Sequence, residues 1–394
     1  MEIGVIFPQT EIGADVGAIR DYAQATEDLG FAHIFIADHV LGADTQFHTH
    51  PSLANYSQHS VVHESLTLMG YLAAITEKVG LVTGILILPQ RQTVLVAKQA
   101  AEIDVLSGGR LRLGIGVGWN QVEFEALGQD FHDRGRRSAE QIEVLRALWT
   151  QEVVDFHGRW HNITHAGLNP LPVQRPIPIW LGGGGAGDSP LNEVVLRRIG
   201  RLADGWCPNF SPDEAGRALM DKVRGYAQQA GRDPAALGLD GRLRTAGKQP
   251  EEWMDEVKSW EEMGANYLSV ETRKGGLSGA DQHIDAIRRF KEENGCERLV
   301  MVWCASTEVF LRPGAVHETL ESFEQAMRDD DPGIAPSMLY AYAALMEGVP
   351  YANGAPNLSE IRLIERDDAT GELRSYTAPF TLAEVDDTEY QLSD

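Results

Sequence analysis

Residues 80–118 read GLVTGILILPQRQTVLVAKQAAEIDVLSGGRLRLGIGVG, and this stretch decides the fold class. It begins with an apolar run of strand length, GLVTGILIL, and ends with another, RLRLGIGVG. Residues 94–109 between them form a predicted helix that finishes on two glycines, which are typical of a helix C-terminus. Strands joined by a helix pair in parallel, so the stretch predicts one β/α unit and the strand of the next.

The same alternation recurs over about the first 295 residues. Eight strands are predicted, at residues 2–9, 33–39, 80–88, 110–118, 176–183, 205–209, 239–245 and 267–273. A helical segment follows each strand, and a short two-stranded ribbon is predicted at 153–164. Eight such units predict an α/β protein with a closed (β/α)8 TIM barrel, and a doubly wound open sheet is the alternative. Active sites of barrels lie at the C-terminal ends of the strands.

Composition excludes several classes of protein. The formal net charge of -24 argues against a nucleic-acid binder and against an anionic membrane surface as a partner. The N-terminus lacks the pattern of a secretory signal, and the longest apolar run is too short to cross a bilayer. Cys207, Cys296 and Cys304 lie far apart, which argues against a disulfide framework and a structural zinc site. A cytoplasmic protein without a metal is therefore predicted.

Two strand ends carry candidate functional residues. The second predicted strand ends in Asp38 and His39, and a carboxylate beside an imidazole can serve as a general acid or base. Alternatively, Asp38 caps a turn and His39 is a solvated loop residue. The third contains Thr83, Gly84 and Ile85, where a glycine inside an apolar strand marks a bulge, a close approach to a ligand, or only a packing bend.

Glycines dominate the next two strand ends. Gly114, Gly116 and Gly118 alternate, which predicts a strand face without side chains and room for a flat ring beside Trp119. The spacing lacks the third glycine of a dinucleotide fingerprint, so it does not favour NAD. Further on, glycines at 182–185 precede Ser189 and Pro190, which are predicted to cap and begin the next helix. This loop predicts a phosphate site, with a plain surface loop as the alternative.

Seven motifs occur in order along this part of the chain: FPQT, ADH, TGILILPQRQ, LSGGRLRLGIGVGWN, GRWHNIT, PIPIWLGG and RLADGW. Together they resemble the luciferase-like monooxygenase superfamily, and more closely its branch of F420-dependent oxidoreductases from actinobacteria. The resemblance covers residues 1–294. It implies a TIM barrel that binds a deazaflavin or a flavin at the strand ends.

The resemblance also implies roles for individual residues. His39 is expected to be the general acid or base beside the ring, oriented by Asp38 or by nearby backbone. The segment Thr83, Gly84 and Ile85 is expected to form a bulge or a non-prolyl cis peptide against the ring. The floor and the phosphate loop then consist of Gly116, Gly118, Trp119, Asn120, Gly182, Gly183 and Gly184.

Coenzyme F420 is the expected cofactor, and hydride transfer to or from a small organic substrate is the expected reaction. FMN with molecular oxygen is the alternative, and a cofactor-binding protein without turnover is a third reading. Trp119 replaces a glutamate of the sugar-phosphate dehydrogenases, which disfavours a sugar-phosphate substrate. Candidate partners for the acidic tail of F420 are Arg91, Arg197 and Arg198, while His63 and Glu64 are weaker candidates at the mouth. A homodimer is compatible with the resemblance.

The remaining residues, 296–394, do not continue the alternation. Residues 298–358 resemble a fragment of myo-inositol-1-phosphate synthase, without the glycine-rich fingerprint and the lysines of that enzyme. This extension holds 19 of the 58 acidic and 6 of the 34 basic residues, so it would repel a phosphate ligand. A catalytically empty remnant is therefore favoured over a regulatory domain. A β-hairpin is predicted around residues 368–371.

Overall fold

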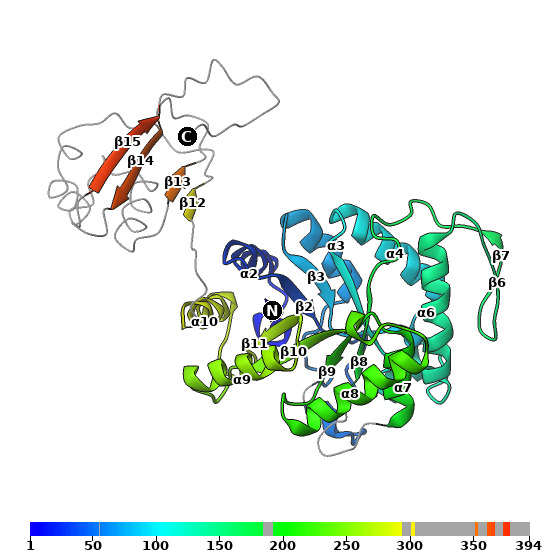
Figure 1. Cartoon of the computed structure of the whole chain (residues 1–394). Helices are drawn as coiled ribbons and strands as arrows, with labels where there is room; N and C mark the ends of the chain where they lie inside the picture. The colour runs from blue at the N-terminus through cyan, green and yellow to red at the C-terminus, as the bar shows by residue number, and fades with distance from the viewer. Residues whose placement is uncertain are drawn as a thin grey trace. The chain divides into compact units, whose positions relative to one another are not determined.

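The computed structural model describes residues 1–54, 56–183, 192–293, 301–303, 351–353, 361–366 and 373–378. The chain divides into two compact units, Met1–Gly295 and Cys296–Asp394. Figure 1 shows the first unit as a ring of strands surrounded by helices.

Eight parallel strands form the first unit. They are β1 (Glu2–Ile6), β2 (His33–Ile36), β3 (Gly80–Thr83), β5 (Leu111–Gly116), β8 (Ile179–Gly183), β9 (Gly205–Pro208), β10 (Gly238–Arg244) and β11 (Tyr267–Glu271). A short strand, β4 (Leu86–Ile87), continues β3 after a bulge and pairs with β5. The sheet closes because β1 pairs with β11 and β3 pairs with β5. The predicted closed barrel is confirmed, and the doubly wound open sheet is excluded.

Helices cover the outside of the barrel (Figure 1). The long ones are α2 (Val16–Asp28), α3 (Ser65–Ile75), α4 (Thr93–Leu106), α6 (Arg134–Thr150), α7 (Glu193–Leu202), α8 (Glu214–Gln229), α9 (Pro250–Glu262) and α10 (Ala280–Glu293). Short helices α1 (Gln9–Ile12) and α5 (Gln121–Ala126) follow β1 and β5 and were absent from the prediction. Single 3-10 turns lie at η1 (Pro51–Ala54), η2 (Leu88–Gln90) and η3 (Pro234–Ala236).

Local sequence explains where these helices begin. Asp15 caps α2 by accepting a hydrogen bond from the Ala18 amide at 2.7 Å. Pro250 occupies the first turn of α9, where a missing N–H costs nothing. The predicted helix α7 is present, but its predicted start was wrong, because its N-cap is Asn192, whose side chain accepts from the Val194 amide at 2.9 Å. The predicted cap, Ser189, lies outside the described residues.

The ribbon is confirmed, as β6 (Val154–His157) pairs antiparallel with β7 (Asn162–Ala166). In the second unit, β12 (Met301–Trp303) runs parallel to β13 (Tyr351–Asn353). There, β14 (Ile361–Arg366) pairs antiparallel with β15 (Leu373–Ala378), which confirms the strands of the predicted hairpin. The expected turn at 368–371 lies outside the described residues.

The inside of the barrel is polar at its centre. Arg112 pairs with Asp240 at 2.6 Å and packs over the rings of Trp180 and Tyr267, whose centroids are 4.5 and 4.0 Å away. Burial holds the pKa of His33 well below its ordinary value, so a neutral imidazole completes this layer. An apolar layer adjoins it, formed by Ile6, Phe35, Val82 and Cys207, with Ile85 packed against them. The apolar layer forms the base of the barrel mouth.

Among the described residues, no helix is both long and apolar enough to cross a membrane. The same part of the chain contains no group of three or more His, Cys, Asp or Glu side chains placed to hold a metal ion.

Candidate active site

The C-terminal ends of the strands form the mouth of the barrel, and most of the predicted site residues lie there. Asp38 and His39 follow β2, and Gly84 and Ile85 follow β3. Gly116 ends β5, while Gly182 and Gly183 end β8. Gly184 lies outside the described residues, as does the rest of the predicted phosphate loop.

His39 is held by a glutamate that sequence reasoning missed. Its Nδ1 lies 3.1 Å from Oε1 of Glu123, on α5, and the imidazole is 10% exposed. The same carboxylate accepts from the Val40 amide at 2.8 Å and from Nε2 of Gln90 at 2.9 Å. Burial alone would raise the pKa of Glu123, but the hydrogen bonds from His39 and Gln90 outweigh it and hold the pKa below its ordinary value.

This arrangement assigns the tautomer of His39. An ionised Glu123 can only accept, so Nδ1 of His39 carries the proton that it donates. Nε2 is then the ring atom left to take up or release a proton. A buried carboxylate behind an imidazole also stabilises the imidazolium, as in other acid–base pairs of active sites.

Asp38 has a different role from the predicted one. Its carboxylate accepts from Arg91 Nη2 at 2.7 Å, from Ser65 Oγ at 3.0 Å and from the Ile87 amide at 3.2 Å. Arg91 also donates to Glu64 at 2.7 Å. Asp38 therefore anchors the end of β2 to α3 and β4, and the prediction that it orients His39 was wrong. Arg91 is already paired with two carboxylates, which weakens its candidacy as a partner for a cofactor tail.

Aromatic rings connect the loop at 40–62 to the mouth. The ring of Tyr56 lies 4.3 Å from that of His39, measured between centroids, and the ring of His50 stacks on Trp119 at 4.6 Å. Trp119 in turn meets His39 edge-on at 5.5 Å. Asn120 donates to the carbonyl of Leu41 at 3.3 Å. Trp119 and Asn120 thus contact the loop, and their place in the floor of a cofactor site stays a prediction.

The glycines of the mouth make room for Ile85. A Cβ added at Gly116 would lie 2.9 Å from Cγ2 of Ile85, and one at Gly182 would lie 2.5 Å from its Cγ1. At Gly114 the added atom would lie 2.1 Å from the carbonyl oxygen of Thr83. The expectation of an empty face along this strand was therefore wrong, because the bulge after β3 fills it. Ile85 presents the surface against which a ring could lie.

Two backbone conformations near this segment are unusual. The peptide bond between Gly84 and Ile85 is cis, which agrees with the alternative of a bulge or a non-prolyl cis peptide there. Gly118 does not share a strand face with Gly116, because β5 ends at Gly116 and Gly118 has a φ of +72°. This left-handed conformation suits glycine and turns the chain toward Trp119.

Charged residues on β10 and β11 form the part of the mouth that sequence reasoning missed. Arg242 and Arg244 end β10, Glu271 ends β11, and Arg273 follows it. Arg273 donates to Glu271 and to the hydroxyl of Tyr56, the latter at 2.9 Å. The signal was present in the sequence, because DGRLR and SVETR place charged or polar side chains at every second position of predicted strands.

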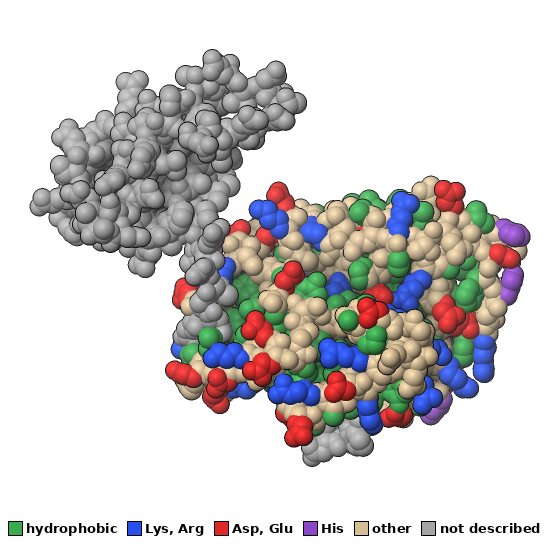
Figure 2. Space-filling model, viewed as in Figure 1, with side chains coloured by type: hydrophobic (Ala, Val, Ile, Leu, Met, Phe, Trp, Pro, Cys, Tyr) green, Lys and Arg blue, Asp and Glu red, His purple; other side chains and the backbone are tan. Residues whose placement is uncertain are grey.

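The other arginines proposed for a cofactor tail lie in the helix layer. Arg197 on α7 packs over the ring of Tyr226 at 5.2 Å. Burial, followed by the nearby Arg134 and Arg201, lowers the pKa of Arg198. Figure 2 shows acidic and basic side chains interspersed on the visible face of the barrel unit.

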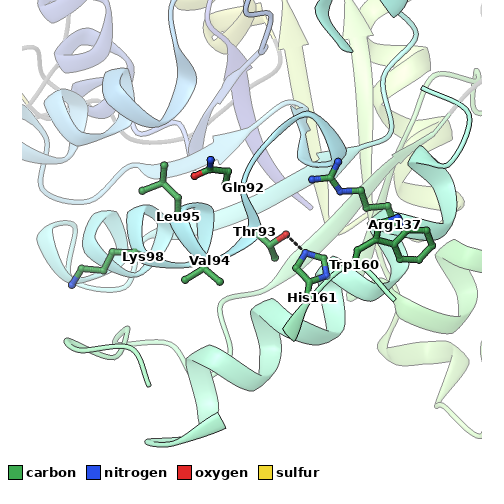
Figure 3. Close-up of a pocket in the computed structure, with 8 residues that line it drawn as sticks. All are labelled: Gln92, Thr93, Val94, Leu95, Lys98, Arg137, Trp160 and His161. Carbon is green, nitrogen blue, oxygen red and sulfur yellow. Dashed lines mark hydrogen bonds between the residues drawn. The ribbon is translucent and has the colours of Figure 1, made fainter. Parts of the chain in front are cut away.

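A separate pocket of about 490 Å³ lies on the helix layer between α4, α6 and the tip of the ribbon (Figure 3). His161, near the ribbon tip, contacts Thr93 Oγ1 through Nε2 at 2.6 Å and Glu140 Oε1 through Nδ1 at 2.8 Å. Glu140 also accepts from the backbone amide of Trp160 at 2.8 Å. These contacts dock the ribbon on the helices, and the lining of the pocket shares no residue with the site described above.

A family model described as Luciferase-like monooxygenase matches residues 1–298. The chain belongs to this family. A second model, described as Myo-inositol-1-phosphate synthase, matches residues 263–365, which agrees with the resemblance of the extension to that enzyme. Members of the luciferase-like family share the closed barrel and are oxidoreductases, but they differ in the cofactor that they bind.

Three similar proteins illustrate the range of this luciferase-like family. An uncharacterized protein of Mycobacterium tuberculosis is 31% identical over 284 residues, which cover 70% of this chain and 92% of the relative. The FMNH2-dependent dimethylsulfone monooxygenase of Pseudomonas putida is 33% identical over 225 residues, or 55% of either chain. A solved F420-dependent secondary alcohol dehydrogenase, in complex with an F420-acetone adduct, covers 73% of this chain and 98% of its own, with a TM-score of 0.59 and 18% identity. The last likeness shows the fold alone.

Proposed function

We propose that this protein is an F420-dependent oxidoreductase that transfers a hydride between coenzyme F420 and a small organic substrate. The observation that carries the proposal is the pair of His39 and Glu123, 3.1 Å apart, at the same end of the barrel as the apolar side chain of Ile85, which follows β3. A two-electron carrier requires from the protein a flat apolar surface, a site from which water is excluded, and one proton donor or acceptor. At the mouth, Ile85 would provide the apolar surface and His39 the proton donor or acceptor.

The residues present fit a deazaflavin or a flavin. Such a ring has apolar faces and a hydrogen-bonding edge. Half-buried Ile85 supplies an apolar surface above the buried cluster that contains Phe35, and its close fit over Gly116 and Gly182 keeps it in place. His39 and the arginines of β10 and β11 supply polar partners around it. Gly182 and Gly183 would lead into the loop proposed for the cofactor phosphate.

The chemistry divides between cofactor and chain. When bound, the ring supplies or accepts the hydride. Nε2 of His39 would remove the proton from a substrate hydroxyl during oxidation, or return it to a carbonyl oxygen during reduction. Glu123 keeps Nδ1 protonated and stabilises the imidazolium. Tyr56, held against His39 and by Arg273, would help to exclude water from the mouth.

A second candidate is an FMN-dependent monooxygenase that uses molecular oxygen. The relative from Pseudomonas putida, named for its use of FMNH2, supports it at 33% identity. The same mouth would seat either ring, because both have the flat apolar face that Ile85 matches. A protein that holds either cofactor without turnover is the third candidate, and the His39–Glu123 pair argues against it.

Equilibrium binding tests the proposal most directly. We would titrate F420 and FMN separately into the intact chain and into a version that ends at Asn294, and follow the change in cofactor fluorescence. We expect tighter binding of F420, with the same Kd in both chains. Tighter binding of FMN would replace the proposal with the monooxygenase. Weaker binding to the shorter chain would show that residues 295–394 help to build the site.

A further inference from the structure

The alternation of side chains along a strand places the arginines of β10 and β11 at the barrel mouth. In β10, Asp240 points into the barrel, where it pairs with Arg112 at 2.6 Å. Arg242 and Arg244 occupy the next two positions on the same face and therefore rise toward the mouth. Leu239 and Leu243 alternate with these residues on the opposite face and are buried in the core outside the barrel. The strand thus directs two guanidinium groups to the mouth.

One carboxylate faces three of these cations. Glu271 pairs with Arg273 through Oε1, and its Oε2 lies 3.2 Å from Nε of Arg244 and 4.0 Å from Nε of Arg242. Burial would raise the pKa of Glu271, but the three arginines outweigh it and hold the pKa below the ordinary value. Counting charges, three guanidinium groups and one carboxylate leave an excess of two positive charges in a chain whose net charge is -24.

Arg242 has N–H donors that are available to a further acceptor. Its side chain is 22% exposed, and within the described residues its one hydrogen bond goes to Asn209 Oδ1, at 3.2 Å. The pKa of Arg242 is lowered, mainly by burial. Glu271 opposes this shift, whereas the positive charges of Arg244 and Arg273 add to it. The protonated guanidinium would therefore be stabilised by one more anion. Arginine suits this role because its planar group can bind a carboxylate or phosphate with two parallel hydrogen bonds.

There is space for such an anion. A pocket of about 480 Å³ is lined by Arg242, Arg244 and Asn209 on the barrel side. Three acidic residues line it too, and two of them have partners: Asp213 caps α8 by accepting from the Gly216 amide at 2.8 Å, and Glu256 pairs with Lys248. The third, Asp255, lies on α9, so the cationic side of the pocket is the one formed by β10.

We propose that Arg242 and Arg244 bind an anionic group, a carboxylate or a phosphate, of a molecule that occupies the barrel mouth. The inference rests on the proposed function, because it concerns what meets the cofactor there. Tyr56 links the two parts, since its hydroxyl accepts from Arg273 and its ring lies 4.3 Å from the ring of His39. A molecule held by its anionic end at Arg242 would extend from the arginines toward His39. The anion belongs either to the substrate or to the acidic tail of the cofactor.

Calorimetric titration with inorganic phosphate tests the site without any cofactor, so its outcome is independent of the proposed function. We would compare the intact chain with Arg242→Gln, Arg242→Lys and the double variant Arg242→Gln/Arg244→Gln. Lys258→Gln is the matched control, because it removes one positive charge from an exposed position of α9, next to Ser259 of the pocket lining. Melting curves would establish that each variant is folded.

We expect Arg242→Gln to weaken phosphate binding about tenfold or more, as the loss of a charge-assisted hydrogen bond implies. Arg242→Lys should retain part of the affinity and Lys258→Gln nearly all of it. Equal affinity in all variants, or no binding to the intact chain, would overturn the inference. Titration of F420 into Arg242→Gln then identifies the source: a raised Kd assigns the anion to the cofactor tail, and an unchanged Kd assigns it to the substrate.

Discussion

Two walls of the barrel mouth differ in chemistry although parallel strands of one barrel build both. The glycine wall consists of Gly114, Gly116 and Gly182 on β5 and β8, with Ile85 seated on it. The arginine wall consists of Arg242, Arg244, Glu271 and Arg273 on and after β10 and β11. On β5 the single charged side chain, Arg112, lies deep in the barrel, whereas on β10 the charges continue to the rim.

The difference shows that one barrel can provide a close-packed apolar surface on one side of its mouth and charged groups on another. Inward positions of a strand that hold glycine allow a neighbouring segment to approach closely, and here that segment ends in an apolar side chain. Arginines at inward positions near the end of a strand hold their guanidinium groups close to solvent, where hydration reduces the free-energy cost of burying a charge. A ligand with an apolar ring and an anionic end would match both walls. At the mouth, His39 contacts both Glu123 of α5 and Tyr56 of the loop at 40–62.

The largest effect on the rate of hydride transfer is expected at His39. This residue belongs to neither wall, so its replacement should leave the affinity for the cofactor nearly unchanged. We expect His39→Asn to lower the rate of hydride transfer by about 10²- to 10⁴-fold, the usual range for a lost acid–base group. The cofactor Kd should change by less than about threefold. Single-turnover absorbance measurements with the cofactor that the chain binds would check this. An unchanged rate would remove His39 from the mechanism.

The glycine wall is tested by Gly114→Ala. A Cβ there would lie 2.1 Å from the backbone oxygen of Thr83, which cannot move without displacing the bulge. We expect the variant to lose about 3 kcal/mol of unfolding free energy, or to lose its cofactor affinity if the bulge shifts. Urea denaturation and cofactor titration measure the two outcomes.

Gly70→Ala is the control for this variant. Gly70 lies inside α3, where an added Cβ meets open space among the described residues. The change should stabilise the helix by about 0.5–1 kcal/mol. Equal effects of the two substitutions would contradict the close packing of the glycine wall.

The arginine wall is tested by Glu271→Gln, which removes the carboxylate between three guanidinium groups. We expect a loss of about 2 kcal/mol in unfolding free energy at pH 7. Folding lowers the pKa of Glu271, so its stabilisation is complete above the unfolded pKa of about 4.3 and is lost as the pH falls through the folded value. The variant and the natural chain should therefore converge in acid.

Urea midpoints at pH 7 and at several pH values below about 4 would measure this convergence, because the stabilisation is lost only below the unfolded pKa. Glu262→Gln, at an exposed position of α9, serves as the control and should change the stability by less than about 0.5 kcal/mol. A difference between Glu271→Gln and the natural chain that stays constant with pH would mean that the carboxylate is not ionised in the arginine wall.

The smallest effect is expected for Glu123→Gln, which leaves both walls intact and changes only the support of His39. An amide keeps one oxygen to accept from Nδ1 of His39 but loses the charge that stabilises an imidazolium. We expect the rate of hydride transfer to fall about tenfold, which corresponds to one hydrogen bond to a charged group. Glu125→Gln on the same helix is exposed and should have no effect. Equal rates in both variants would assign Glu123 a purely structural role.

Much of the fold could be predicted because strand and helix periods are local properties of a chain. The eight strands, the ribbon and the hairpin strands after residue 360 all follow from patterns only a few residues long. The position of His39 at the mouth follows as well, since parallel strands of a barrel present their C-terminal ends together.

The partners of these residues could not be predicted in the same way. Glu123 meets His39 from 84 positions away along the chain, through a helix of six residues that the sequence did not indicate. Ile85 fills the space of Gly116 and Gly182 because three separate strands converge there. The roles of Asp38 and the start of α7 were misjudged for the same reason, as short-range patterns do not reveal long-range hydrogen bonds.

The sequence by itself determined the barrel, its family and the set of side chains at each strand end, because alternation and turn residues act over short distances. Only the tertiary structure decided which of those side chains meet: His39 with Glu123, Asp38 with Arg91, and Glu271 with three arginines. Closure of the sheet causes this difference. It brings the ends of β1 and β11 together across more than 260 residues, and no local pattern records which side chains will then share a partner.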